Sequence, residues 1–138
     1  MKHTLTLTIT ITSLLAILFL TFHLTDDTLH AKLGTAEAGG STLVAVPILV
    51  VWLYGTLMLA GRRSGYVIML IGSLLGLLVP IVHVVGAGGV FHGELAKSSG
   101  DFLFVWTLHA LGVTALFSLV LSAIGLLSPQ RADASSVS

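Results

Sequence analysis

The sequence predicts an all-α protein, a four-helix transmembrane bundle with up-down topology. The chain of 138 residues is 55% hydrophobic and only 9% charged, whereas soluble domains are about 25% charged. Four segments of about 20 mostly apolar residues are each long enough to cross a hydrocarbon core of about 30 Å as a helix. Polar connections separate these segments, so we expect successive helices to run in opposite directions.

The first predicted span, 5–24, begins with TLTLTITIT, a period-two alternation that is typical of a strand. An isolated strand leaves its backbone unsatisfied in lipid, whereas a helix does not, and Thr hydroxyls can bond carbonyls one turn earlier. We therefore predict a helix. A signal peptide is the alternative, but the apolar run exceeds the usual ~7–15 residues and the nearest small-x-small site, Ala36-Glu37-Ala38, lies too far downstream. We expect an uncleaved span.

The rest of the chain continues this pattern within one domain. The other predicted spans are 42–60, 66–85 and 102–127. Gly61-Arg62-Arg63-Ser64-Gly65 predicts a tight basic hairpin between two of them. Residues 1–127 are thus assigned to the membrane domain, and the Ser- and Ala-rich segment 128–138 is predicted to be a disordered cytoplasmic tail.

Charge distribution predicts the orientation. Four spans place both termini on one side, and that side carries four of the six cations, namely Lys2, Arg62, Arg63 and Arg131. The positive-inside rule then assigns both termini to the cytoplasm, with Arg62 and Arg63 as topology determinants.

Composition also excludes several functions. Six Lys and Arg balance six Asp and Glu, so net charge favours neither nucleic acid nor an acidic partner. Cysteine is absent, which excludes thiolate catalysis, Fe–S clusters and covalent haem attachment. No nucleophile–base pair or phosphate-binding loop is visible, so we do not expect an enzyme.

The stretch HLTDDTLH at the end of the first span is a candidate metal site. If the helix continues, His23, Asp26, Asp27 and His30 fall at i, i+3, i+4 and i+7, on one helix face. Imidazole and carboxylate ligands suit Zn²⁺, Mn²⁺ or Fe²⁺. The simpler interpretation is a polar collar, in which Asp26 or Asp27 caps a short interfacial helix.

His83 in the third span extends the metal hypothesis. It falls on the stripe of Gly72 and Gly76, a GxxxG pattern that we expect to face a neighbouring helix. His83 is then predicted to point into the bundle at about the level of His23, unless it bonds a carbonyl freed by Pro80. The predicted ligands are His23, Asp27, His30 and His83, with His92 and Glu94 added from the loop 86–101.

The fourth span has two different faces. Thr114, Ser118 and Ser122 form a stripe of small residues, the usual packing face of a membrane helix. His109 projects from the other side, about 7 Å deeper than His83 along the helix, which makes the two a poor pair of haem ligands. We expect His109 either to face a second protein surface or to bond Asp101 or Glu94.

The segments RRSGYVIMLIG and SSGDFLFVWTLHALGVTALFSLVLSAIGL resemble small four-span bacterial membrane proteins with no assigned function. The resemblance implies a bacterial inner-membrane location. Our leading hypothesis is a protein that packs in the lipid bilayer as an accessory subunit or homo-oligomer. Divalent metal binding or transport at the outer face is the alternative, and b-type haem electron transfer is third.

Overall fold

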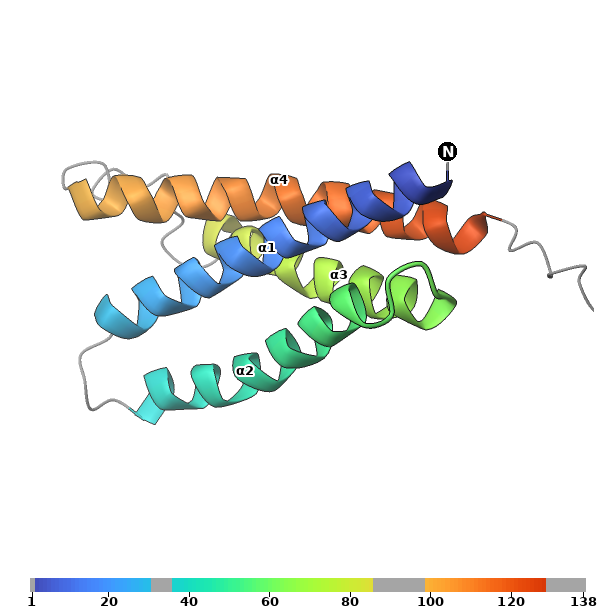
Figure 1. Cartoon of the computed structure of the whole chain (residues 1–138). Helices are drawn as coiled ribbons and strands as arrows, with labels where there is room; N and C mark the ends of the chain where they lie inside the picture. The colour runs from blue at the N-terminus through green and yellow to red at the C-terminus, as the bar shows by residue number, and fades with distance from the viewer. Residues whose placement is uncertain (1, 31–35, 86–98, 129–138) are drawn as a thin grey trace, which may run out of the picture.

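The computed structural model describes residues 2–30, 36–85 and 99–128, and within these ranges every element is a helix. The helices are α1 (Lys2–His30), α2 (Ala36–Leu57), α3 (Arg63–Val85) and α4 (Ser99–Leu127). They run alternately up and down, so the N-terminus, the α2–α3 turn and the end of α4 lie at the same end of the molecule (Figure 1). The all-α four-helix bundle is thus confirmed.

The four helices do not contact one another equally. The most extensive contacts join α4 to α3 and α4 to α1. α2 packs against α3 and α1, and in the described residues its backbone does not approach that of α4. In Figure 1, α2 lies at the outer edge of the bundle, away from α4. One side of α2 therefore supports the bundle, and its remaining surface faces outward.

The helices begin earlier than the apolar pattern predicted. α3 begins at Arg63 and α4 at Ser99, each three residues before the predicted span, and α1 extends from Lys2 to His30. Hydropathy marks only the part of a helix that suits lipid, whereas polar residues can complete helical turns outside it. Helix length therefore exceeds the predicted span length at these ends.

The predicted basic hairpin is shifted along the chain. The turn comprises residues 58–62, with Gly61 at φ +78°, the left-handed region that favours glycine. The carbonyl oxygen of Arg62 accepts a hydrogen bond from the N–H of Tyr66 at 3.1 Å. Ser64 therefore lies in the first turn of α3. The expectation that Ser64 and Gly65 belong to the hairpin is wrong, and the second span ends at Leu57 rather than residue 60.

The alternating threonines of α1 behave as predicted for a helix. Their hydroxyls donate to the carbonyl four residues earlier, with Thr8 bonded to Thr4 at 2.9 Å and Thr10 to Thr6 at 2.9 Å. Thr21 and Thr25 form the same bond further along α1. Back-bonding hides the hydroxyls from lipid, so the period-two pattern is compatible with a membrane helix.

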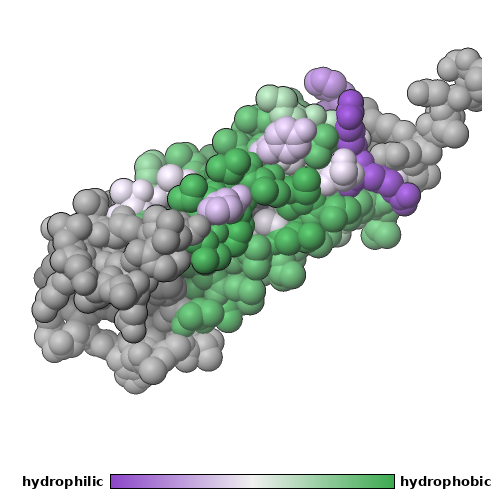
Figure 2. All heavy atoms as spheres, turned by 90° about the horizontal axis from the view of Figure 1, so that it is seen from below, coloured by the Kyte–Doolittle hydropathy of each residue, from purple (hydrophilic) through white to green (hydrophobic). Residues whose placement is uncertain are grey.

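Within the described residues, three helices are long and apolar enough to cross a membrane, over His3–Thr25, Arg63–Val82 and Val105–Leu127. The apolar stretch found in α2 is shorter, Val44–Leu57, although the whole helix of 22 residues is about 33 Å long. Figure 2 shows an apolar surface over the body of the molecule and the most hydrophilic atoms gathered toward one end. The chain is a helical membrane protein.

The interior combines apolar side chains with small hydroxyls. Ile9, Trp52, Met69, Leu111 and Ala115 are among the buried apolar residues. The buried serines and threonines of the described residues are Ser13, Thr56, Ser73, Ser118 and Ser122. Small polar residues permit close helix contact and hydrogen bonds between helices, so this interior is typical of a membrane bundle.

Candidate functional site

The stretch HLTDDTLH lies entirely within α1, which runs without interruption to His30. The interpretation in which Asp26 or Asp27 caps a new interfacial helix is therefore wrong, because both residues lie inside an existing helix. The continuous helix is the condition under which His23, Asp26, Asp27 and His30 share a face. His23 itself is buried, with 2% of its surface exposed.

The other predicted metal ligands lie beyond what the structure describes. The side chains of Asp27, His30 and His83 are outside the described part, and so are residues His92 and Glu94 altogether. Among the described side chains, no group of three or more His, Asp or Glu is arranged to hold a metal ion. The shared cation between His23 and His83 stays a prediction.

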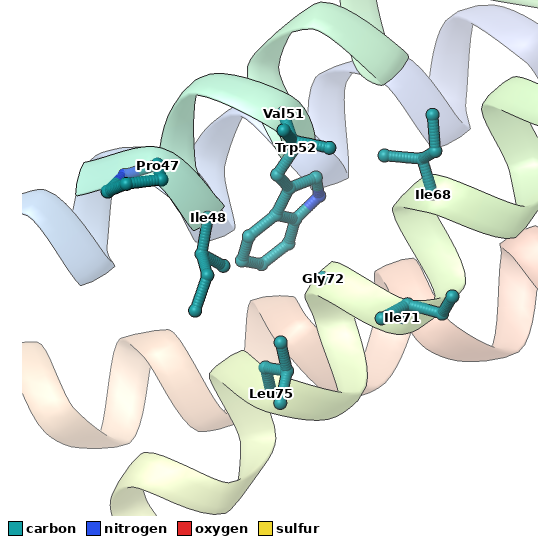
Figure 3. A pocket seen from close by; sticks show the side chains of 8 residues that line it. All are labelled: Pro47, Ile48, Val51, Trp52, Ile68, Ile71, Gly72 and Leu75. Atoms are coloured by element: carbon teal, nitrogen blue, oxygen red, sulfur yellow. The ribbon is translucent and has the colours of Figure 1, made fainter. Parts of the chain in front are cut away.

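Gly72 and Gly76, the GxxxG pair of α3, form a seat for the indole ring of Trp52 (Figure 3). A Cβ atom at Gly72 would overlap the ring, and one at Gly76 would lie 3.1 Å from Cη2 of Trp52 and 3.6 Å from Cβ of Ala115. Both glycines are buried. The pattern thus accommodates a side chain from α2 and contacts α4 within the same chain.

A hydrogen-bond circuit holds Trp52 in this seat. Its Nε1–H donates to Oγ of Ser13 at 2.8 Å, and Thr56 donates its hydroxyl hydrogen to the carbonyl of Trp52 at 2.8 Å. Ser13 Oγ lies 2.8 Å from Thr56 Oγ1. Because Thr56 has one hydrogen, which its bond to the carbonyl uses, Ser13 is the donor to Thr56. The three residues form a closed, buried circuit that joins α1 to α2.

Two further hydrogen bonds join other helix pairs. Ser73 of α3 donates to Ser118 of α4 at 2.8 Å in the interior. The hydroxyls of Thr6 in α1 and Tyr66 in α3 lie 3.1 Å apart, and Tyr66 packs against Gly125 of α4. Each of these bonds satisfies a polar group that would otherwise be costly in an apolar interior.

The predicted packing stripe of α4 divides into two parts. Ser118 and Ser122 are fully buried, and Ser118 accepts the bond from Ser73. Thr114 is half-buried and donates to the carbonyl of Ala110 at 2.7 Å within its own helix. Ser118 therefore contributes a polar contact between helices, whereas Thr114 satisfies its hydroxyl locally.

Sequence reasoning did not find Ser13. It lies in a span rich in Thr and Ser, where nothing distinguishes it from its neighbours, and its partners Trp52 and Thr56 lie 39 and 43 residues away. The one available signal was the indole N–H of Trp52, which needs an acceptor when buried. That signal predicts a partner without naming it.

Two apolar grooves lie on either side of α3. The first, between α2 and α3, has a volume of about 300 Å³. Figure 3 shows the residues that line it, which are Pro47, Ile48, Val51, Trp52, Ile68, Ile71, Gly72 and Leu75. The second, between α3 and α4, has a volume of about 380 Å³ and includes one polar residue, His109. Leu74 and Leu78 of α3 are exposed and line neither groove.

His109 faces outward from α4, alongside the exposed Trp106 and Val113. Its Nδ1 lies 2.8 Å from the carbonyl oxygen of Val105, one turn earlier. This hydrogen bond is made within α4. The side chain of Asp101 and residue Glu94 lie outside the described part of the chain, so a bond from His109 to either of them stays a prediction. His109 is exposed whereas Ser118 and Ser122 are buried, as the helix periodicity predicted.

Arg62 and Arg63 are exposed at the junction of the α2–α3 turn and α3. This junction lies at the same end of the bundle as the N-terminus (Figure 1). Cations at this position suit contact with anionic lipid headgroups and an aqueous compartment.

The fold, the apolar exterior and the hydroxyl-linked interior define a helical membrane bundle. Comparison with protein-family models, with functionally characterised proteins and with solved structures finds no match.

Proposed function

We propose that this protein works by association in the bacterial inner membrane, as a homo-oligomer or an accessory subunit, through the outer surface of α2 and α3. The groove between these helices carries the proposal. Both of its walls are apolar, and its volume of about 300 Å³ suits large side chains from a neighbouring helix. In the part of the chain that the structure describes, the backbone of α2 does not approach that of α4, so the outer side of α2 can receive that neighbour.

The interior supports the same conclusion. The indole ring of Trp52 packs against the GxxxG pair of Gly72 and Gly76. The buried hydroxyl of Ser13 bonds to that of Thr56, and the hydroxyl of Ser73 bonds to that of Ser118. These contacts hold the chain's own helices together. Association with a second copy must then use the outer surface, and a groove gives larger contact area there than a convex helix face does.

Filling this groove tests the proposal. Ile71→Trp places an indole in the groove, and we expect it to weaken self-association by about tenfold, which corresponds to about 1.4 kcal/mol. Leu74→Trp is the matched control, because Leu74 is similarly exposed (47% against 51%) on the same helix but lines neither groove. The measurement is energy transfer between labelled copies in liposomes over a range of lipid-to-protein ratios.

The two variants and the unmodified protein give distinguishable outcomes. Loss of transfer in Ile71→Trp with retention in Leu74→Trp supports association through this groove. Equal behaviour of the two variants would contradict the assigned surface, and an unmodified protein that shows no transfer at any ratio would contradict self-association. In that second case, the accessory-subunit form is tested by co-purification from the native membrane.

We further propose that both termini face the cytoplasm. The positive-inside rule supports this, since Lys2, Arg62 and Arg63 lie at one end of the bundle.

A further inference from the structure

The groove between α3 and α4 differs from its counterpart because one polar side chain, His109, lies among apolar ones. The groove has a volume of about 380 Å³. Gly112 lies close to Pro80 at its floor, because a Cβ atom at Gly112 would lie in van der Waals contact with Cγ of Pro80, at 3.4 Å. Leu77, Ile81 and Leu108 complete an apolar surface around it. The groove thus combines room for a hydrocarbon chain with a single group that can form hydrogen bonds.

The hydrogen bond to Val105 determines whether Nε2 of His109 donates or accepts a hydrogen bond. A carbonyl oxygen only accepts, so Nδ1 of His109 carries the hydrogen in its 2.8 Å contact with Val105. In a neutral imidazole, Nε2 then has no hydrogen and is an acceptor. A partner for the exposed side of this ring must therefore donate a hydrogen bond.

Depth restricts the donor to a neutral group. Among the described side chains, the apolar span of α4 begins at Val105, four residues before His109, so His109 lies at least about 6 Å along the helix from the start of that span. Water is scarce at that level, and a charged donor such as the ammonium of a phospholipid headgroup is costly there. A phosphate or an ionised fatty acid presents only acceptors. Among the groups of membrane lipids, this leaves a neutral hydroxyl next to acyl chains as the donor.

We propose that the groove between α3 and α4 binds diacylglycerol, whose single free hydroxyl donates to Nε2 of His109 while an acyl chain occupies the apolar groove. This lipid is neutral, carries its hydroxyl directly on the glycerol that bears the chains, and thus matches both the acceptor and its depth. The site lies on a different side of α3 from the proposed association surface, so a result that contradicts one proposal does not affect the other.

Trp106 provides a direct readout. It is 62% exposed and lies one turn from His109, whereas Trp52 is 1% exposed, so lipids that carry bromine on their acyl chains quench mainly Trp106. The full chain is placed in phosphatidylcholine liposomes with brominated diacylglycerol. The comparison lipid is the same brominated diacylglycerol acetylated at the free hydroxyl, which removes the donor and keeps the chains.

We expect the hydroxyl lipid to associate about two- to tenfold more strongly than the acetylated lipid, the range for one net hydrogen bond. His109→Phe should abolish this preference and leave binding of the acetylated lipid unchanged. Gly112→Leu, which fills the groove but keeps His109, should weaken both lipids. Helix content by circular dichroism checks that each variant is folded.

Three results would overturn the proposal. The first is equal quenching by the two lipids in the unmodified protein, which means that no hydroxyl is recognised. The second is a hydroxyl preference that survives in His109→Phe, which means that a different residue provides the acceptor. The third is retained binding of both lipids in Gly112→Leu, which means that the groove is not the site.

Discussion

At the scale of single residues, the two neighbouring aromatic residues Trp52 and Tyr54 of α2 have opposite environments. Trp52 is buried, but Tyr54 is 56% exposed. Two residues along a helix turn the side chain by about 200°, and α2 has only one side against the bundle. Burial of Trp52 therefore requires Tyr54 to face outward.

The circuit of Trp52, Ser13 and Thr56 predicts a specific sensitivity. Ser13→Ala removes the acceptor of the indole N–H and leaves that donor buried without a partner. We expect the free energy of unfolding to fall by about 1–2 kcal/mol, since hydrogen bonds between membrane helices average about 0.6 kcal/mol and a buried unsatisfied group costs about 1–3 kcal/mol. The measurement is reversible unfolding in mixed micelles, followed by tryptophan fluorescence.

Thr8→Ala is the control for this variant. Thr8 is exposed and its hydroxyl donates to the carbonyl of Thr4 in its own helix, so loss of the hydroxyl should change stability by less than about 0.5 kcal/mol. Equal effects of Ser13→Ala and Thr8→Ala would show that the circuit contributes nothing specific.

At the scale of helices, the GxxxG pattern of α3 was predicted to face a neighbouring helix, and its neighbour is the side chain of Trp52 rather than a bare backbone. The pattern indicates that something approaches closely, because glycine has no side chain, but it does not say what approaches. The identity of the partner depends on how α2 packs on α3, a property that neither helix contains alone.

The seat of Trp52 predicts an order among glycine variants. Gly72→Ala places a Cβ atom within the indole ring, whereas Gly76→Ala brings it to 3.1 Å of the ring edge. We expect Gly72→Ala to lose about 1–3 kcal/mol of stability by overpacking and Gly76→Ala distinctly less. The free energies of unfolding of the two variants give the comparison.

A double variant identifies the cause. In a Trp52→Leu background the ring is absent, so Gly72→Ala should cost little, and the cycle should show a coupling energy above about 0.5 kcal/mol. Additive effects would mean that Gly72 is required for a reason other than the indole ring.

At the scale of the whole molecule, the up-down arrangement brings both termini and the α2–α3 turn to one end. α2 is the helix whose crossing most needs a test, because among the described side chains its apolar stretch, Val44–Leu57, is shorter than those of the other three helices. If α2 does not cross the membrane, the α2–α3 turn lies on the opposite side from the N-terminus.

The absence of cysteine makes this test simple. Single variants His3→Cys and Ser64→Cys should react with a membrane-impermeant maleimide only after the cells are permeabilised, since both positions belong to the proposed cytoplasmic end. Phe102→Cys, at the start of α4 and 70% exposed, should react in intact cells. Opposite labelling of His3→Cys and Ser64→Cys would contradict a spanning α2.

The sequence by itself determined the membrane class, the number of helices and their alternating direction. Apolar length and backbone satisfaction in lipid are local properties of each segment, so composition and spacing are enough to predict them. Only the tertiary structure decided that Ser13 accepts from Trp52, that Gly72 seats an indole, and that His109 borders a groove. Each of these depends on residues brought together from different helices, and their register is set by packing across the bundle, which the pattern along one helix does not encode.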